Sequence, residues 1–425
     1  MTDNASLEAN VNTNSRPSEL KITDMRICNL KGLPMDVTLI RLDTNQGISG
    51  YGEVRDWASP TYALMLKSRI LGENPCNIDK IFRKIKQFGH HARQGGGVCG
   101  IEMALFDLAG KAYGVPAYQL VGGKFRDKVL CYCDTDSVPD GTQMGERLKK
   151  RMEEGFQFLK MDIGIGLLKD VRGALTAIPE MLETQNVMHP FTGIQVSPLG
   201  IEFLVDYVRQ VRDVIGYEVP LAVDHFGHIT VGTCIRLGRA LDPFMLAWYE
   251  DMIPWQFTDQ YVRLSQSVMT PICTGEDIYL KEGFKPLLEA QGVAVIHPDL
   301  ATSGGIMETK KIGDLAQEHG VAMAMHFAGS PISFLANIHC AAATENFYVL
   351  ENHSVDLPWW DDLLDASTKP MIQDGYAPVP ELPGLGFGDI NEAAIRERMD
   401  STRSGGYFDE TSQWNDERSH DRLWS

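Results

Sequence analysis

Long apolar segments and an excess of basic residues are both missing from this chain of 425 residues. No run of 18 apolar residues occurs, which argues against a membrane-spanning helix. Acidic residues outnumber basic residues by 57 to 39 and give a net charge of −18, so we expect neither nucleic acid nor a membrane as a partner. A small anionic substrate is still allowed, because a bound metal ion can reverse the local field.

Closely spaced cysteine pairs and a dinucleotide-binding motif are also missing. The eight cysteines show no Cys-x-x-Cys spacing and most lie in apolar surroundings, so we expect reduced thiols in a cytoplasmic protein. No Gly-x-Gly-x-x-Gly motif stands at a strand-to-helix turn, so a dinucleotide site is unsupported. Residues 1–19 are polar, lack the pattern of a secretion signal, and are expected to form a disordered leader.

What the chain does contain is three carboxylates at equal spacing. Asp224, Glu250 and Glu276 each end a short apolar run, at intervals of 26 residues. A strand, a loop and a helix take about that many residues, so three parallel strands would each deliver an acid at one edge of a sheet. Each pair of carboxylates about 4 Å apart would repel by roughly 4 kcal/mol. A cation is therefore expected, and hard oxygen ligands favour one Mg²⁺ ion. The alternative is that they are ordinary solvated or helix-capping acids.

The order of expected elements predicts two domains. Three strands and then helical patterns indicate an α+β domain over residues 20–127, which the family resemblance given below implies is a cap. Alternating strands and helices follow over residues 128–370, and eight expected strands favour a closed TIM (β/α) barrel, an α/β fold, over an open sheet; the same resemblance implies a modified TIM (β/α) barrel. The interval between the second and third strands is too long for one βα unit, so we expect an insertion around His189. We expect residues 371–400 to return to the cap and residues 401–425 to form a loosely ordered polar tail.

Further chemistry-bearing residues end other expected barrel strands. Asp299 and His326 end neighbouring strands, which would allow a carboxylate to orient a histidine general base; alternatively His326 is a core residue. Lys160 and Asp162 are two apart, so both face into the barrel. Lys160 could bind a substrate carboxylate or pair with neighbouring acids. Glu351 could hydrogen-bond a substrate oxygen or cap a helix.

Taken together and in this order, these motifs resemble the enolase superfamily and its mandelate racemase subgroup. The resemblance spans about residues 20–398 and is carried by Gly50–Glu53, Gly100–Lys111, Lys160–Asp162, Asp224, Glu250, Glu276, Pro298-Asp299, Ser303–Gly305, His326 and Leu350-Glu351. It implies a capping domain, a modified barrel and one essential Mg²⁺. It also implies removal of the proton α to a substrate carboxylate, which gives an enediolate whose charge the metal, the lysine and a carboxyl donor stabilise.

The chain departs from this family at Asp162, where racemases of this type have a second lysine. Because racemisation needs a base on each face, the loss of one favours dehydration of a sugar acid to a 2-keto-3-deoxy acid. His326 would remove the α-proton, and the β-hydroxyl would leave. Protonated His326, Asp162, His225 and His228 are candidates for the general acid. Phe226 stands where some sugar-acid dehydratases of the family carry a histidine.

Two cap loops resemble the specificity loops of this family, and we expect Arg55 and Trp57 to contact substrate, as well as His225 and His228 in the barrel. A polar segment after residue 89, with His90, could add contacts; in the alternative these residues are plain surface polarity. We expect a homo-oligomer with a small-molecule sugar acid as substrate. Two alternatives stay open, namely a cycloisomerase or epimerase that uses the same enediolate, and a non-catalytic barrel with a regulatory or structural role.

Overall fold

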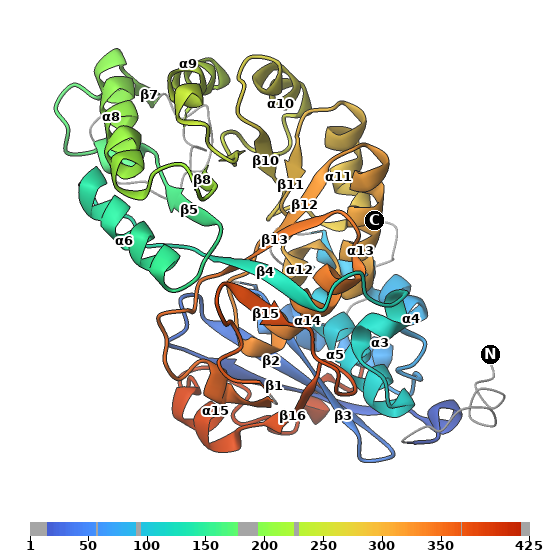
Figure 1. Cartoon of the computed structure of the whole chain (residues 1–425). Helices are drawn as coiled ribbons and strands as arrows, with labels where there is room; N and C mark the ends of the chain where they lie inside the picture. The colour runs from blue at the N-terminus through green and yellow to red at the C-terminus, as the bar shows by residue number, and fades with distance from the viewer. Residues whose placement is uncertain are drawn as a thin grey trace.

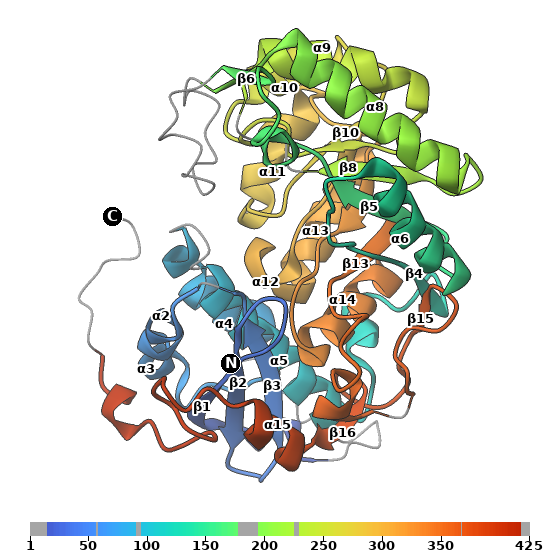
Figure 2. The same cartoon turned by 90° about the vertical axis from the view of Figure 1, so that its left-hand side faces the viewer.

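The computed structural model of the protein describes residues 15–56, 58–90, 95–176, 194–224, 229–366 and 368–417. Figure 1 shows a barrel in the upper half of the molecule and a smaller domain, built from the N-terminal strands, below it. The C-terminal segment lies beside this smaller domain in both views (Figure 2). Among the helices of the described ranges, none is long and apolar enough to cross a membrane.

The capping domain pairs a three-stranded antiparallel sheet with a long helix. Its strands are β1 (Ile22–Leu30), β2 (Val37–Thr44) and β3 (Ser49–Val54), and its helices are α2 (Pro60–Met65), α3 (Lys67–Ile70), α4 (Ile78–Ile85) and α5 (Gly95–Tyr113). Helix α5 lies directly on β3, because glycines let the two backbones approach. A Cβ atom at Gly52 would come within 1.9 Å of the Gly100 carbonyl oxygen, so the contact requires glycine. The expected α+β cap is therefore formed.

Eight parallel strands close the barrel, as the sequence predicted. They are β4 (Lys128–Cys133), β5 (Leu159–Asp162), β8 (Leu221–Asp224), β9 (Tyr249–Glu250), β10 (Ile272–Thr274), β11 (Val295–Ile296), β12 (Ala322–Met325) and β13 (Phe347–Asn352). Closure is shown by β13, which pairs with both β12 and β4, with Glu351 opposite Tyr132. Because parallel strands share one carboxyl edge, the residues that end them are brought to one rim.

Helices surround the barrel strands on the outside (Figures 1 and 2). The longer ones are α6 (Gly141–Glu153), α8 (Pro198–Ile215), α9 (Val231–Leu241), α10 (Thr258–Ser265), α11 (Leu280–Glu289), α13 (Gly305–Glu318) and α14 (Pro331–Ala343), and short α7 (Ile165–Leu168) and α12 (Leu300–Ser303) accompany them. Several begin at the capping residues that sequence favours. Asp140 accepts the Gln143 N–H at 2.8 Å, and Ser197 accepts the Gly200 N–H at 3.1 Å. Between β5 and β8 lie the two short paired strands β6 (Leu175–Thr176) and β7 (Gln195–Val196). The expected insertion around His189 falls between them, outside the described residues.

Two acids of the cap, Glu53 and Glu102, are buried at the starts of barrel helices. Glu53 accepts the Ser330 N–H at 2.8 Å, at the start of α14. Glu102 accepts the N–H groups of Ile306 and Met307 at 2.7 and 2.9 Å, at the start of α13. Burial raises the pKa of each carboxyl to about 8, and the N–H donors oppose that shift. These contacts fix the cap against the barrel.

The segment after the barrel joins both domains. Strand β15 (Tyr376–Pro378) pairs antiparallel with the barrel strand β4, and β14 (Leu364–Ala366) pairs with β16 (Phe387–Ile390). Helix α15 (Glu392–Arg398) then brings the chain to the cap, where the Lys31 N–H donates to the Arg398 carbonyl at 2.9 Å. Residues 371–400 thus contact the barrel before they reach the cap.

The expectation of a loose tail over residues 401–425 is wrong for residues 401–417. Phe408 is 2% exposed and packs edge-on to Tyr51, with ring centroids 6.1 Å apart. The buried ammonium of Lys67 donates to the Thr411 carbonyl at 3.0 Å. The polar composition of this segment gave no sign that Phe408 is buried or that Thr411 pairs with Lys67. At the other end, the 3₁₀ turn Pro17–Glu19 lies within the predicted leader. Residues 1–14 and 418–425 lie outside the described structure.

Candidate active site

The predicted strand-end residues meet at one rim of the barrel. Asp224 and Glu250 end β8 and β9, Glu276 lies two residues beyond β10, and Glu351 lies in β13. The site residues with buried side chains are Lys160, Asp224, Glu250, Asp299, His326 and Glu351. Such a concentration of buried charge is costly unless the charges compensate one another or a cation is bound.

Asp224, Glu250 and Asp251 form a group of carboxylates that can each offer an oxygen atom within 4.8 Å of the others. Glu276, the third predicted ligand, lies near enough to act on Asp251, and its Oε1 and Oε2 also lie 3.3 Å from Arg55 Nη2 and from His326 Nε2. Asp251 was missed in the sequence, although it directly follows a strand-end acid. Burial, and then the charges of Glu276, Asp224 and Glu250, raise the pKa of Asp251 well above its usual value. A divalent cation would relieve this repulsion, and the all-oxygen donor set fits Mg²⁺.

Lys160 provides a positive charge at the centre of the acids. Its Nζ lies 2.8 Å from Asp224 Oδ2, 2.7 Å from Glu351 Oε1 and 3.4 Å from Glu250 Oε1. Burial alone would lower the pKa of Lys160, but these three carboxylates outweigh burial and raise it well above its usual value. The side chain therefore stays an ammonium ion, which can bind an anionic group but cannot act as a base.

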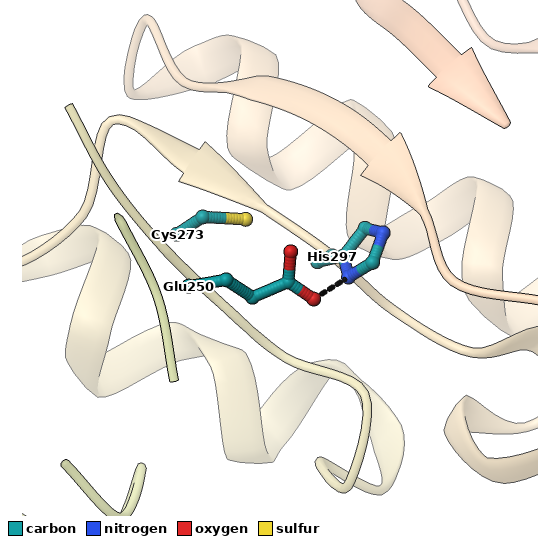
Figure 3. A group of neighbouring side chains, drawn as sticks. All are labelled: Glu250, Cys273 and His297. Atoms are coloured by element: carbon teal, nitrogen blue, oxygen red, sulfur yellow. Dashed lines mark ion pairs between the residues drawn. The ribbon is translucent and has the colours of Figure 1, made fainter. Parts of the chain in front are cut away.

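The Glu250 carboxylate contacts two residues that the sequence did not single out, Trp248 and His297. Trp248 Nε1 donates to Glu250 Oε2 at 2.8 Å, and His297 Nδ1 lies 2.6 Å from Oε1. Figure 3 shows the imidazole of His297 pointing at this carboxylate, with the Cys273 thiol beside it. The Tyr132 hydroxyl hydrogen-bonds with the other nitrogen of His297 at 3.0 Å. His297 directly follows β11 and precedes Asp299 by two positions, so extending the strand alternation beyond β11 could have identified it.

Asp299 and His326 form the predicted pair. His326 Nδ1 lies 2.6 Å from Asp299 Oδ2, and Asp299 Oδ1 accepts the Ala301 N–H at 2.7 Å. Burial alone would lower the pKa of His326, but the carboxylates of Glu276, Glu351 and Asp299 outweigh it and raise the pKa to about 10. With Nδ1 bonded to Asp299, Nε2 faces the interior of the site, 3.3 Å from Glu276 Oε2 and 3.8 Å from Glu351 Oε2. With this charge balance the ring carries a proton. A cation held by the acids would offset the carboxylates that raise the pKa of His326, and Nε2 would then face the site as a proton acceptor.

Arg55 enters the site from the cap and lies against the barrel acids. Its guanidinium is 2% exposed, donates to the Glu276 carbonyl and to Thr302 Oγ1, both at 2.7 Å, and lies 3.5 Å from Asp299 Oδ2. There it lowers the pKa of Asp299 against the opposing effect of burial. Arg55 thereby ties the cap to the Asp299–His326 pair. A direct contact of Arg55 with substrate stays a prediction.

Of the remaining predicted site residues, the structure describes Asp162 and His90 but not Trp57, His225 or His228. Asp162 ends β5 and is half-buried, and its carbonyl accepts a hydrogen bond from Ser137 Oγ at 3.4 Å. His90 packs edge-on to Tyr279, with ring centroids 5.2 Å apart. Trp57, His225 and His228 lie outside the described residues, as do residues 91–94. Their contacts with substrate, like the general-acid role of Asp162, stay predictions.

Comparison with known proteins agrees with this architecture. Residues 143–394 match the family model of the enolase C-terminal domain-like fold, and residues 10–122 match the N-terminal domain of mandelate racemase and muconate lactonizing enzyme. The chain is 36% identical over 361 residues to D-xylonate dehydratase of Haloferax volcanii, an alignment that covers 82% of each chain. It is 30% identical over 399 residues to D-galactonate dehydratase family member RspA of Pantoea ananatis, covering 88% of this chain and 93% of that one.

Solved structures show the same arrangement. The crystal structure of a mandelate racemase/muconate lactonizing enzyme-like protein from Rubrobacter xylanophilus superposes with a TM-score of 0.81, at 29% identity. The match covers 92% of this chain and all of that one. Both domains, their order along the chain and the barrel are thus shared. The chain belongs to the enolase superfamily, in its mandelate racemase subgroup.

Proposed function

We propose that this protein is a Mg²⁺-dependent dehydratase of a sugar acid, which removes the proton α to the carboxylate and expels the β-hydroxyl to give a 2-keto-3-deoxy acid. The observation that carries the proposal is the Asp299–His326 pair, whose Nε2 faces a buried group of acids around the ammonium of Lys160. The relatives named D-xylonate dehydratase and D-galactonate dehydratase support an aldonic acid as the substrate.

Each residue has a part that follows from its position. Lys160 would bind the substrate carboxylate, because it is a fixed cation, and Glu351 would accept a hydrogen bond from a substrate hydroxyl. His326 would take the α-proton at Nε2, and Asp299 would hold the ring through Nδ1 and stabilise the positive charge that forms. Mg²⁺ held by Asp224, Glu250 and Glu276, with Asp251 beside them, would offset the acids' charge and stabilise the developing enediolate.

Dehydration is favoured over racemisation by the residue at position 162. A 1,1-proton transfer needs a base on each face of the α-carbon, and the second lysine of the racemases is an aspartate here. An epimerase or cycloisomerase would share the same first step, so the two reactions differ in whether water is lost. Product analysis therefore decides between them.

The test is incubation of the full chain with Mg²⁺ and a panel of aldonates and aldarates that includes D-xylonate and D-galactonate. We expect at least one of them to give a keto acid that reacts with semicarbazide, and we expect EDTA to abolish its formation. If no substrate of the panel gives a keto acid, the proposal is overturned.

His326→Asn tests the assigned base. The variant should fold and bind Mg²⁺ but lose turnover by about 10³-fold or more, within the usual contribution of a general base. His319→Asn is the matched control, because His319 ends α13 on the outer layer of the barrel and lies outside the proposed machinery. Undiminished turnover in His326→Asn would remove His326 from the mechanism.

A further inference from the structure

A second histidine–carboxylate pair lies on the barrel rim beside the first. Asp134 directly follows β4, and His353 directly follows β13, the strand that pairs with β4 to close the barrel. His353 Nδ1 lies 3.3 Å from Asp134 Oδ2. This pair repeats the relation of Asp299 and His326, which also end neighbouring strands. None of the roles assigned above uses it.

His353 faces the same space as His326. The two imidazole centroids lie 5.8 Å apart, and Glu351 stands between the rings. Glu351 Oε2 lies 3.8 Å from His326 Nε2, and Glu351 Oε1 lies 3.4 Å from His353 Nε2. The three groups can direct a nitrogen or oxygen atom to positions within 4.8 Å of one another. A substrate bound at Glu351 would therefore lie against both rings.

The inward nitrogen of His353 is buried and only weakly held. Nε2 forms an ion pair with Glu351 Oε1 at 3.4 Å, and among the described residues it has no hydrogen bond of good geometry. A hydroxyl group of a ligand bound at Glu351 would supply that hydrogen bond. The side chains of His353 and Asp134 are 16% and 17% exposed, whereas that of His326 is 6% exposed. His353 thus lies on the more open side of the site, where water can leave.

We propose that His353, oriented by Asp134, is the general acid of the dehydration and donates its Nε2 proton to the leaving β-hydroxyl. The inference rests on the proposed function and assigns the group that the sequence left open among Asp162, His225, His228 and His326. Burial alone would lower the pKa of His353, but the charges of Glu351 and Asp134 outweigh it and raise the pKa, which favours a ring that carries the proton.

The proposed dehydration transfers one proton to His326 and one proton from His353. His326 Nε2 takes the α-proton, and the C–H electron pair forms the enediolate. That pair then forms the Cα–Cβ double bond while the Cβ–O bond breaks, and the leaving oxygen takes the His353 proton and departs as water. The enol product tautomerises to the 2-keto acid. His326 ends protonated and His353 ends neutral, and proton exchange with solvent restores both.

The test separates proton removal from departure of the hydroxyl. His353→Asn keeps a donor toward Asp134 but cannot transfer a proton. With a substrate that wild type dehydrates, we expect dehydration to fall by about 10²–10⁴-fold, while exchange of the α-proton with D₂O continues. A 3-deoxy-3-fluoro analogue should still lose fluoride at near the wild-type rate, because fluoride departs without protonation.

Asp134→Asn should lose less dehydration than His353→Asn and should also retain α-proton exchange, since Asp134 only positions the ring. This second variant tests the assignment even if His353→Asn fails to fold. His319→Asn serves as the matched histidine control. Wild-type dehydration by His353→Asn, or equal losses with the hydroxyl and fluoro substrates, would overturn the assignment. If wild type itself turns over no sugar acid, the proposed function fails and this assignment fails with it, whereas an active wild type with an unaffected variant refutes the His353 role alone.

Discussion

The Asp299→Asn substitution tests the arrangement of the candidate base. The change keeps the shape of the side chain and removes its charge. An Asn oxygen can still accept the Ala301 N–H that Asp299 Oδ1 accepts at 2.7 Å, so the start of helix α12 is preserved. What is lost is the carboxylate 2.6 Å from His326 Nδ1, which stabilises the imidazolium that forms when the α-proton is taken.

The size of this loss follows from the geometry. Two unit charges centred about 4 Å apart interact by about 4 kcal/mol at an effective dielectric constant near 20. Because each 1.4 kcal/mol is about a tenfold change in rate, kcat should fall by roughly 10³-fold. Stability should change much less, by about 1–2 kcal/mol, since Arg55 loses one carboxylate but keeps Asp56, Asp277 and the Glu276 carbonyl.

Turnover and α-proton exchange should be measured on the same preparation, with thermal unfolding as the check on folding. Asp107→Asn is the matched control, because this buried aspartate lies in the cap and accepts the N–H groups of Tyr51 and Leu385 at 3.0 and 2.9 Å. It should lose stability but not kcat. If Asp299→Asn keeps kcat and exchange within threefold of wild type, the carboxylate does not position the base and the reasoning is refuted.

Three further predictions concern metal binding, the cap and acid stability. Mg²⁺ at 100 times its Kd should stabilise the fold by about 2.7 kcal/mol, and Glu250→Gln should lose most of the resulting rise in Tm; an equal rise in the variant would place the metal elsewhere. In Arg55→Lys the ammonium cannot donate to both Thr302 and the Glu276 carbonyl as the guanidinium does. The free energy of unfolding, measured by chemical denaturation, should therefore fall by about 1–3 kcal/mol, and an unchanged value would contradict the cap contact. Burial lowers the pKa of His339 to about 4, below its value in the unfolded chain, so stability should fall as pH drops below about 6.5, by about 2 kcal/mol at pH 5. His339→Gln should show that much less destabilisation between pH 7 and pH 5, and equal destabilisation would refute the assignment.

The parts of the fold that could be predicted are those that repeat. Barrel strands follow apolar runs that lead to polar residues at the rim. Asp224 and Glu250 end their strands and His326 directly follows β12, as predicted, whereas Asp299 lies three residues beyond β11, where it pairs with His326. The period of the βα unit carries this information, because it fixes which residues reach one edge. The cap was predictable for a similar reason, since alternating strands precede helical patterns.

The parts that could not be predicted depend on contacts between distant residues. Nothing local shows that Phe408 is buried against Tyr51, or that Arg55 passes from the cap to Asp299. Glu276 has the right spacing for a metal ligand, but its orientation is set by Arg55 and His326, which lie on other elements. His353 could have been found, because it is two positions beyond Glu351 and strand alternation places both on one face.

The most direct test of the proposed dehydration is proton NMR of the wild-type reaction in D₂O, with Mg²⁺ and the best substrate of the aldonate and aldarate panel. We expect loss of the α-proton signal together with loss of water, and a product whose carbon at position 3 carries deuterium beside a keto group at position 2. An epimer or lactone isomer that retains every hydroxyl oxygen would contradict it.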